Sequence, residues 1–388
     1  MILGRSLPPF LLLSAVAACG SAPAPEGLVA DTLSNGRVFL SYPAQESSDG
    51  PTWLLREDLR LGQSDGVDPG GFGKVVAVAT DASGKIYVAD GLAHEVRIFD
   101  ADGRQRGVFG GKGSGPGEFR FISGLAAHPD GTLWVMDPGN RRLNIHDSTG
   151  ALLADLRHGL GPLVTIPWAG SFDRRGRLYD VVSRDDAKAL VRYAVSGEEL
   201  VPSDTLDIPP FHVPQYSFNR DGISFITSVP FSPSQKYTVG PDGSVWLTNS
   251  DQFRIHKLDF SGDTLLTIEV RQDPLRLTAR QRDSAAAAAG LRKDRIPNHM
   301  PAIRFLTVDD EGRVWIMPEG RERGSQVWVV FEPDGRYFGR VHSAVPLDVE
   351  TVPPVIRAGA VLGVTRDDLD IDYVVRLRLE PNAGADPA

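Results

Sequence analysis

The stretch Asp81–Val88, DASGKIYV, decides the fold, because its pattern returns four more times along the chain. Each copy places an aspartate close to a glycine and then alternates apolar with other residues. The other copies are Pro129–Val135, Asp173–Tyr179, Asp242–Leu247 and Asp310–Ile316. A second glycine follows the first after 19, 19, 21, 19 and 23 residues, at Gly103, Gly150, Gly197, Gly262 and Gly335. Such regular spacing indicates an internal structural repeat.

Each repeat predicts four short antiparallel strands. Glycine adopts the positive φ that a tight hairpin turn needs, and the neighbouring aspartate caps the turn. The apolar residues on either side recur with period two, as in Ile86 and Val88, which is typical of half-buried strands. Four-stranded units at this period are the blades of a β-propeller. We therefore expect an all-β propeller of antiparallel blades over residues 50–380, with one short inserted helix.

The spacing predicts six blades. Five units begin near residues 75, 122, 167, 235 and 302. The sixth unit has three C-terminal strands, and its fourth strand comes from the N-terminal segment; these strands are Pro354–Arg357, Ala360–Thr365, Tyr373–Leu379 and Thr52–Leu61. Closing the ring with both chain ends in one blade removes exposed sheet edges. Seven blades remain the alternative, counting either a hairpin at Leu28–Tyr42 or the insertion at Phe211–Phe225.

Composition and charge exclude several classes of function for this chain. Hydrophobic residues make up 41% of the 388 residues and charged residues 23%, which indicates a folded chain with a substantial core. The formal net charge of −9 argues against nucleic-acid binding, which normally needs a basic surface. The single cysteine excludes an internal disulfide and a cysteine-rich metal site.

The N-terminus resembles an export signal. Arg5 precedes an apolar run within residues 1–18 that is shorter than the roughly 20 residues a membrane span needs. The sequence Val16-Ala17-Ala18-Cys19 resembles the bacterial lipobox, which implies that Cys19 is lipidated and anchors the protein to a membrane. An ordinary cleaved signal with a chance cysteine is the alternative. We expect a protein of the bacterial cell envelope, on the periplasmic or outer-membrane side.

The segments that flank the propeller, residues 19–49 and 381–388, also have expected roles. Residues 19–49 would hold the lipidated Cys19 and a tether, with an extra hairpin as an open alternative. Residues 381–388 would form a disordered tail.

Two units also carry a recognisable motif. The segments DGLAHEVRIFD (Asp90–Asp100) and DPGNRRLNIH (Asp137–His146), with the linker FGGKGSGPGEF (Phe109–Phe119), resemble NHL repeats. The second unit keeps Asp137, Asn140 and Arg142 of the family pattern, and the first unit keeps Asp90. The chain as a whole resembles bacterial six-bladed β-propeller lipoproteins related to NHL-repeat proteins. This resemblance implies a structural role for the four motif residues; units three to six lose the Asn-x-Arg pair.

Strand direction predicts where a ligand binds. The Asp-Gly turns all lie on one end of the strands, called here the turn face. The second-to-third loops and the connections between units lie on the opposite end, the loop face. The insertions all belong to the loop face: Gly111–Glu118, Arg157–Ile166, Asp207–Phe231 and Arg271–Pro301. Long loops on a rigid scaffold are where binding residues concentrate, although these loops could also simply pack over the blades.

One insertion predicts a helix within residues 278–293. Thr278 and Gln281 have the spacing of a capping box before an alanine-rich run. Gly290 should weaken this helix and Pro297 should end it. A lid, a partner-docking element and simple packing are the possible roles.

Candidate binding residues are aromatic or basic groups expected on the loop face. Trp168 should begin an innermost strand at the mouth of the central channel, with Arg304 and Arg357 at comparable positions in later blades. The insertion Asp207–Phe231 combines aromatic residues with arginine, which suits contact with a protein or a glycan and equally suits a small core over the channel. The full set is Trp168, His212, Tyr216, Arg220, His299, Arg304 and Arg357.

Catalytic motifs are missing from the sequence. No H-x-H or H-E-x-x-H pair or G-x-S-x-G elbow occurs, and Gly113 after Lys112 breaks a phosphate-loop pattern. We therefore predict no catalytic residue and no cofactor, and expect a monomeric binding or scaffolding module for an envelope protein or glycan. The alternative is a lactonase-like metal-dependent hydrolase or lyase at the channel mouth. Its calcium or zinc would be held by histidines from separate blades: His94, His158, His212 and His299.

Overall fold

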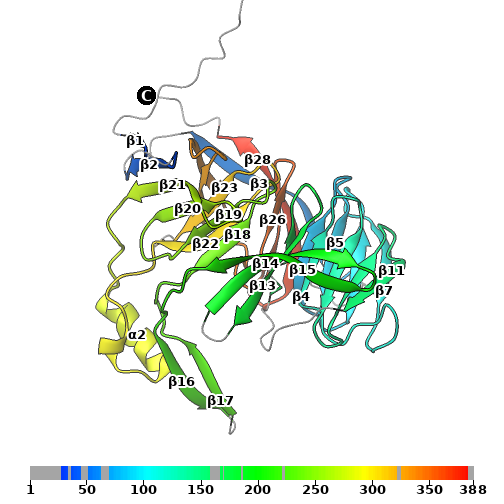
Figure 1. Cartoon of the computed structure of the whole chain (residues 1–388). Coiled ribbons are helices and arrows are strands. Elements are labelled where there is room, and N and C mark those ends of the chain that lie inside the picture. Colours follow the sequence, from blue (N-terminus) through cyan, green and yellow to red (C-terminus); the bar gives the residue numbers. More distant parts are fainter. Residues whose placement is uncertain are drawn as a thin grey trace, which may run out of the picture.

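The computed structural model describes residues 28–33, 36–44, 51–62, 70–157, 167–168, 170–184, 187–220, 223–320 and 325–382. These residues form 28 strands, one α-helix and one short 3-10 turn, so the expectation of a mostly-β chain with one inserted helix is confirmed. Figure 1 shows the sheets arranged around a common centre in a β-propeller. The expected signal peptide, Cys19 and His158 lie outside the described residues.

Antiparallel pairing groups most of the strands into sets of four, called here units and numbered in chain order. Unit 1 comprises β4 (Val75–Thr80), β5 (Ile86–Asp90), β6 (Glu95–Phe99) and β7 (Gln105–Gly110), and unit 2 comprises β8 (Gly124–Ala127), β9 (Leu133–Asp137), β10 (Arg142–His146) and β11 (Leu152–Arg157). Unit 3 comprises β12 (Ser171–Phe172), β13 (Leu178–Arg184), β14 (Ala187–Ser196) and β15 (Glu199–Ile208), and unit 4 comprises β18 (Lys236–Val239), β19 (Val245–Thr248), β20 (Arg254–Leu258) and β21 (Thr264–Arg271). Unit 5 comprises β22 (Ile303–Val308), β23 (Val314–Pro318), β24 (Gln326–Phe331) and β25 (Tyr337–Ser343), and unit 6 comprises β26 (Val355–Arg357), β27 (Ala360–Arg366), β28 (Asp372–Pro381) and β3 (Thr52–Leu61).

The predicted Asp-Gly turns are confirmed. All ten repeat glycines have positive φ, for example +83° at Gly84. In the same turn, the Asp81 carboxylate accepts hydrogen bonds from the Ser83 amide at 2.8 Å and the Lys85 amide at 3.1 Å. The carboxylate therefore stabilises the turn locally, which explains why the pattern is readable in the sequence.

An aromatic residue three positions after the first turn glycine packs each unit against the next. Tyr87, Trp134, Tyr179, Trp246 and Trp315 are all at most 5% exposed, and each lies in an apolar cluster shared with the following unit. A sixth cluster joins unit 6 to unit 1, with Val364 and Val374 against Val75 and Val78. Burying an aromatic side chain contributes about 1.5–3 kcal/mol, so these contacts hold neighbouring units together.

The N-terminal strand β3 lies in the same sheet as the C-terminal strands β26, β27 and β28. β3 pairs in antiparallel register with β28, from Leu61 opposite Val374 to Trp53 opposite Pro381. The first residues of β3 also pair in parallel with β25 of unit 5. Pro381 ends β28, so the expected C-terminal tail begins later than residue 381, and residues 383–388 lie outside the described part of the chain.

Two hairpins lie outside the repeat. β1 (Val29–Thr32) and β2 (Val38–Pro43) form the hairpin left open within residues 19–49, and β2 pairs in parallel with β21 at the outer edge of unit 4. β16 (Gln215–Arg220) and β17 (Ile223–Ser228) form a separate two-stranded sheet. Within the described residues, neither hairpin belongs to a separate four-stranded sheet. No helix among the described residues is long and apolar enough to cross a membrane.

Candidate functional site

A central pocket of about 590 Å³ is lined by the first strand of every unit. These strands are β4, β8, β12, β18, β22 and β26. Most of the lining side chains are small or apolar, including Ala77 and Ala79 from unit 1 and Gly124 from unit 2. Inner strands of neighbouring units touch directly, as β4 does with β8 and β26. The pocket is therefore the centre of the propeller.

Hydrogen bonds tie the turns together around one end of this pocket. Arg174 donates from its backbone to the Pro241 carbonyl at 2.9 Å and from its guanidinium to the Asp310 carbonyl at 2.5 Å. The Asp310 carboxylate accepts from the Ala358 amide at 3.2 Å. Turns of units 3 to 6 are thus joined on the turn face.

Arg304 and Arg357 lie at opposite ends of their strands, which corrects the expectation that they are comparable. Arg304 is the second residue of β22, at the loop face, and its guanidinium lies 3.4 Å from the Glu350 carboxylate. Arg357 is the last residue of β26, at the turn face, where it lines the central pocket. The reason is that β26 has only three residues before its turn, so an arginine near its start in sequence already lies at its far end.

Trp168 was expected to begin an innermost strand; it instead lies three residues before β12, and it lines the central pocket. Its side chain is only 8% exposed, and the indole N–H donates to the Asp180 carboxylate at 2.8 Å. The same residue belongs to the apolar cluster between units 2 and 3. Its polar group is therefore occupied by the protein itself, and only part of the ring is left for a ligand.

Two charged groups that make no hydrogen bond or close ion pair through their side chains with any described residue accompany Arg304 at the loop face. Lys236 begins β18, and Glu319 follows β23. Burial lowers the pKa of the Lys236 ammonium and raises the pKa of the Glu319 carboxyl, and Glu350 and Arg304 act on both. Each of the two side chains is half-buried. Such partly buried ionisable groups are frequent at binding sites.

The histidines of the metal-dependent alternative are not gathered in the described part of the chain. His94 occupies a turn with φ of 56°, whereas His212 and His299 are exposed residues of two different linkers. Among the described residues, no group of three or more His, Cys, Asp or Glu side chains could hold a metal ion.

The predicted capping box is present in α2 (Ala279–Ala289). The Thr278 hydroxyl accepts from the Gln281 amide at 3.2 Å, and the Gln281 side chain accepts from the Thr278 amide at 2.9 Å. The helix ends earlier than expected, because Gly290 adopts a left-handed φ of 64° and caps it. Pro297 instead follows the 3-10 turn Lys293–Arg295.

The two longest linkers pack on each other and form a platform on the loop face. Its small apolar core comes from both linkers: Val229, Leu277, Ala286, Ile296 and Met300, with Tyr216, Phe231, Leu275, Ala285 and Leu291 at its margin. Of the candidate residues in these linkers, Tyr216 contacts this core, while His212 and His299 are exposed. Arg220 ends β16, and its side chain lies outside the described residues. The structure therefore does not bring the seven candidates into one site.

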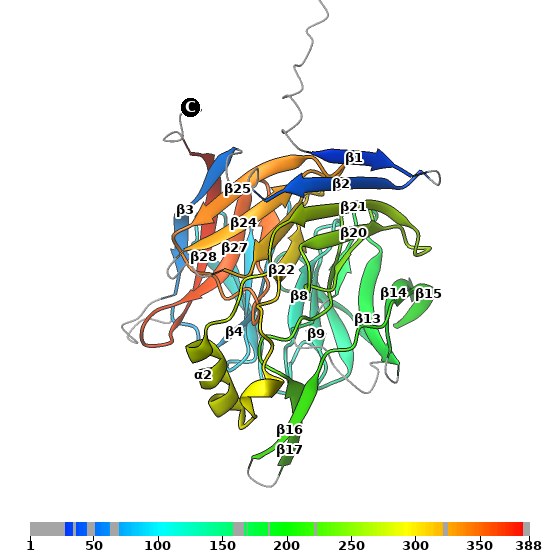
Figure 2. The ribbon, with the colours of Figure 1, turned by 90° about the vertical axis from the view of Figure 1, so that its left-hand side faces the viewer.

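The hairpin β16–β17 extends the platform away from the body of the molecule (Figure 2). Phe218 and Phe225 are directly opposite each other across the hairpin, with stacked rings 5.4 Å apart. Their side chains are 40% and 41% exposed. An exposed aromatic pair on a projecting hairpin resembles the anchors found at protein interfaces.

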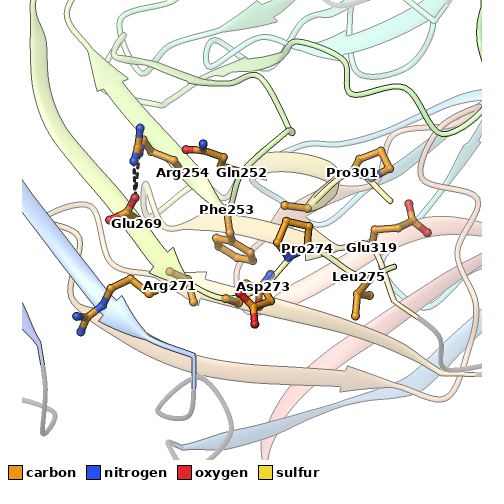
Figure 3. Close-up of a pocket in the computed structure, with 13 residues that line it drawn as sticks. Gln252, Phe253, Arg254, Glu269, Arg271, Asp273, Pro274, Leu275, Pro301 and Glu319 are labelled. Carbon is orange, nitrogen blue, oxygen red and sulfur yellow. Dashed lines mark hydrogen bonds and ion pairs between the residues drawn. The ribbon is translucent and has the colours of Figure 1, made fainter. Parts of the chain in front are cut away.

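A second, smaller pocket of about 290 Å³ opens on the loop face between units 4 and 5, and is called here the loop-face pocket (Figure 3). Gln252 and Phe253 come from the β19–β20 connection, Arg254 begins β20, and Glu319 comes from the loop after β23. The rest of the lining comes from the end of β21, at Glu269–Arg271, and from the linker that carries α2. Sequence reasoning marked that linker as an insertion but missed the other residues, which belong to short loops and to the strands β20 and β21.

The four residues of the NHL-like motif make hydrogen bonds to nearby loops. The Asp90 carboxylate accepts from the Gly73 amide at 2.7 Å, and Asp137 accepts from the Phe121 amide at 3.1 Å. Asn140 donates to the Gly113 carbonyl at 3.0 Å. Arg142 donates to the carbonyls of Gly115 and Glu118 at 2.6 and 2.8 Å. The glycine-rich linker that joins units 1 and 2 is thus bound by Asn140 and Arg142 of unit 2.

Comparisons with known proteins give structural likenesses only. No protein-family model matches the sequence, and no curated protein matches it. Among solved structures, a Bacteroides fragilis protein described as exported is 12% identical, with 88% of this chain and 99% of that chain covered and a TM-score of 0.48. A catalytically inactive virginiamycin B lyase from Staphylococcus aureus is 12% identical (84% and 99% covered, TM-score 0.43). The calcium-binding protein regucalcin from Agrobacterium tumefaciens is 15% identical (86% and 97% covered, TM-score 0.40). Identities and scores this low carry no argument about activity.

Proposed function

We propose that this chain is an exported, lipid-anchored β-propeller that binds an envelope protein or glycan through its loop face and has no catalysis of its own. The observation that carries the proposal is the platform of two linkers with its exposed Phe218–Phe225 pair. A two-stranded hairpin is marginally stable by itself, so exposed aromatic rings on it are costly unless they serve a contact.

The propeller has six blades, closed by β3 and related to NHL-repeat proteins. Six apolar clusters between successive units, including the one between units 6 and 1, support this number. The antiparallel pairing of β3 with β28 supports closure by the two chain ends. The contacts of Asn140 and Arg142 with the glycine-rich linker support the NHL relation.

Anchoring at Cys19 would orient the loop face away from the membrane. Val29, the first residue of β1, is ten residues after Cys19, so β1 lies within about 35 Å of the lipid. The β1–β2 and β16–β17 hairpins lie at opposite ends of the molecule in both Figure 1 and Figure 2. The platform is therefore presented to the envelope space and not to the bilayer.

The anchor is tested by Cys19→Ala in the full chain, followed by membrane fractionation. We expect the protein to move from the membrane fraction to the soluble envelope fraction. Unchanged membrane association after loss of this cysteine would contradict the lipid anchor.

Binding is tested by placing a photo-crosslinking amino acid at Phe225 or, as a control on the turn face, at Ser83. We expect one discrete adduct in intact cells from position 225 and none from position 83. A Phe218→Ser change should suppress the adduct without lowering the melting temperature. Equal labelling from both positions would contradict binding through the loop face.

The lactonase-like alternative is tested by metal analysis of the purified protein before and after chelation. A binding module should remain folded and keep the same melting temperature without metal. Near-stoichiometric calcium or zinc that survives gel filtration would instead favour the hydrolase or lyase.

A further inference from the structure

The loop-face pocket contains polar side chains with unused hydrogen-bonding capacity. Gln252, Gln272 and Asp273 line the pocket and are exposed, and Glu319 lines it from the side of unit 5. Within the described residues, none of these four side chains makes a hydrogen bond or a close ion pair. Amide and carboxylate groups can accept and, for amides, also donate hydrogen bonds. They are therefore available to a ligand rich in hydroxyl groups.

The remaining wall of the pocket is apolar. The Phe253 ring is almost completely buried, at 4% exposure, and forms a firm base. Pro274, Leu275, Pro301 and Ala302 surround it, and Figure 3 shows Phe253 beside Pro274 with polar side chains on both sides. An apolar base with polar groups at its rim is the usual composition of a small-molecule site.

The charges of the pocket argue against an anionic ligand. The Arg254 guanidinium lies 2.5 Å from the Glu269 carboxylate, so this arginine is already neutralised. The lining also contains one further arginine, Arg271, and two further carboxylates, those of Asp273 and Glu319. The pocket thus has one negative charge in excess, which repels phosphate and carboxylate groups.

We propose that the loop-face pocket binds a neutral sugar unit of a glycan. Hydroxyl groups of the sugar would bond to the amides and carboxylates, and its C–H face would pack on Pro274, which is exposed and lies beside the buried Phe253. The volume of about 290 Å³ lies at the lower end for ligand sites, which suits one short segment or one end of a glycan chain. This inference rests on the proposed function, because it names the kind of partner that the loop face receives.

The test is isothermal titration calorimetry of the full mature protein in detergent with chitotetraose and maltotetraose. A neutral alanine peptide and inorganic phosphate are the comparison probes. Gln252→Ala and Asp273→Ala each remove a rim group, and both residues are exposed, so folding should be retained. Asp251→Ala is the matched control, because Asp251 is exposed, adjacent in sequence to Gln252 and not part of the lining.

We expect one of the oligosaccharides to bind, and each rim variant to raise its dissociation constant by about tenfold, which corresponds to about 1.4 kcal/mol. The control should bind like the wild type, and phosphate should not bind. Absence of sugar binding at millimolar concentration, preference for the peptide, or equal affinity in all variants would overturn the proposal.

Failure here is distinguishable from failure of the proposed function. If the crosslink from position 225 persists while no oligosaccharide binds, the protein is a binding module whose partner is not held as a sugar in this pocket. If sugar binds but no crosslink forms, the pocket is a sugar site and the platform is not the contact surface for a partner.

Discussion

The turn face and the loop face are the two ends of the same repeated units, but they differ in the length and role of their connecting segments. On the turn face, short Asp-Gly turns satisfy their own backbone and touch neighbouring turns, as Arg174 does with Pro241. On the loop face, long linkers carry α2, the β16–β17 hairpin, half-buried charges and the loop-face pocket. The difference teaches that the repeat builds the scaffold, whereas departures from the repeat create surfaces on which a partner can act.

The largest expected effect contrasts an aromatic residue of the repeat with one of the platform. Trp315 is 1% exposed and packs between units 5 and 6, so Trp315→Ala should lower the free energy of unfolding by about 3–5 kcal/mol. Phe225 is 41% exposed, so Phe225→Ala should cost at most about 1 kcal/mol. Denaturant unfolding of both variants measures the contrast. Equal costs would remove the distinction between scaffold and platform.

Glycine substitutions sharpen the comparison at an intermediate size. An alanine methyl at Gly243, with φ of 84°, would lie 2.8 Å from the Tyr179 hydroxyl and 2.9 Å from the Arg177 guanidinium. At Gly290, with φ of 64°, the same methyl meets nothing within 4 Å. We expect Gly290→Ala to cost about 1 kcal/mol from backbone strain alone and Gly243→Ala to cost about 2 kcal/mol or more. Thermal melting of both variants measures the two costs. A larger loss of stability for Gly290→Ala than for Gly243→Ala would contradict the contact argument.

A smaller loss of stability is expected at Asn140, where a residue of the repeat binds the glycine-rich linker. Asn140→Ala removes hydrogen bonds to the Gly113 carbonyl and to the Asp137 carboxylate. It should cost about 1–2 kcal/mol and speed amide hydrogen exchange in residues 111–118. Exchange in the turn at residues 147–151 is the internal control and should not change. Faster exchange in both segments would indicate global destabilisation instead.

The smallest effects concern pH, and the two faces should respond with opposite sign. Burial alone would raise the pKa of Asp81, but hydrogen bonds from Ser83, Tyr87 and backbone amides outweigh it and lower the pKa below 3.8. The stability from this carboxylate is therefore complete above pH 3.8 and is lost as the pH falls through the lower folded value. Burial raises the pKa of Glu319 above 4.5, so its contribution is complete below pH 4.5 and is lost as the pH rises.

Melting curves from acidic to neutral pH test both signs. Asp81→Asn should lower the melting temperature at neutral pH and make its decline in acid less steep. Glu319→Gln should raise the melting temperature at neutral pH and change little in acid. A melting temperature of the Glu319 variant that is lower at neutral pH would show that this carboxylate has a stabilising partner.

Much of the scaffold could be predicted because its signals are local. A positive φ at Gly84 and an aspartate that bonds to amides two and four residues away both lie within one short segment. The partner of β28 was also predictable, because the last unit has only three strands of its own and Thr52–Leu61 was the unassigned strand. The capping box of α2 depends on two residues three positions apart.

The candidate site was largely beyond sequence reasoning. The loop-face pocket combines Gln252 of unit 4 with Glu319 of unit 5, and neither loop has a distinctive pattern. Trp168 lies just outside the strand it was expected to begin, and its bond to Asp180 depends on a strand that starts ten residues later. Arg357 was expected to be comparable with Arg304, yet it ends β26 whereas Arg304 is the second residue of β22.

By itself, the sequence determined the repeat, its turns and the inserted helix, since each depends on interactions within a few residues. Only the tertiary structure decided that β2 joins β21, that the two longest linkers share one core, and that polar side chains from separate units surround Phe253. These contacts join residues far apart in the chain, and their energies depend on burial and distance, which only the assembled ring defines.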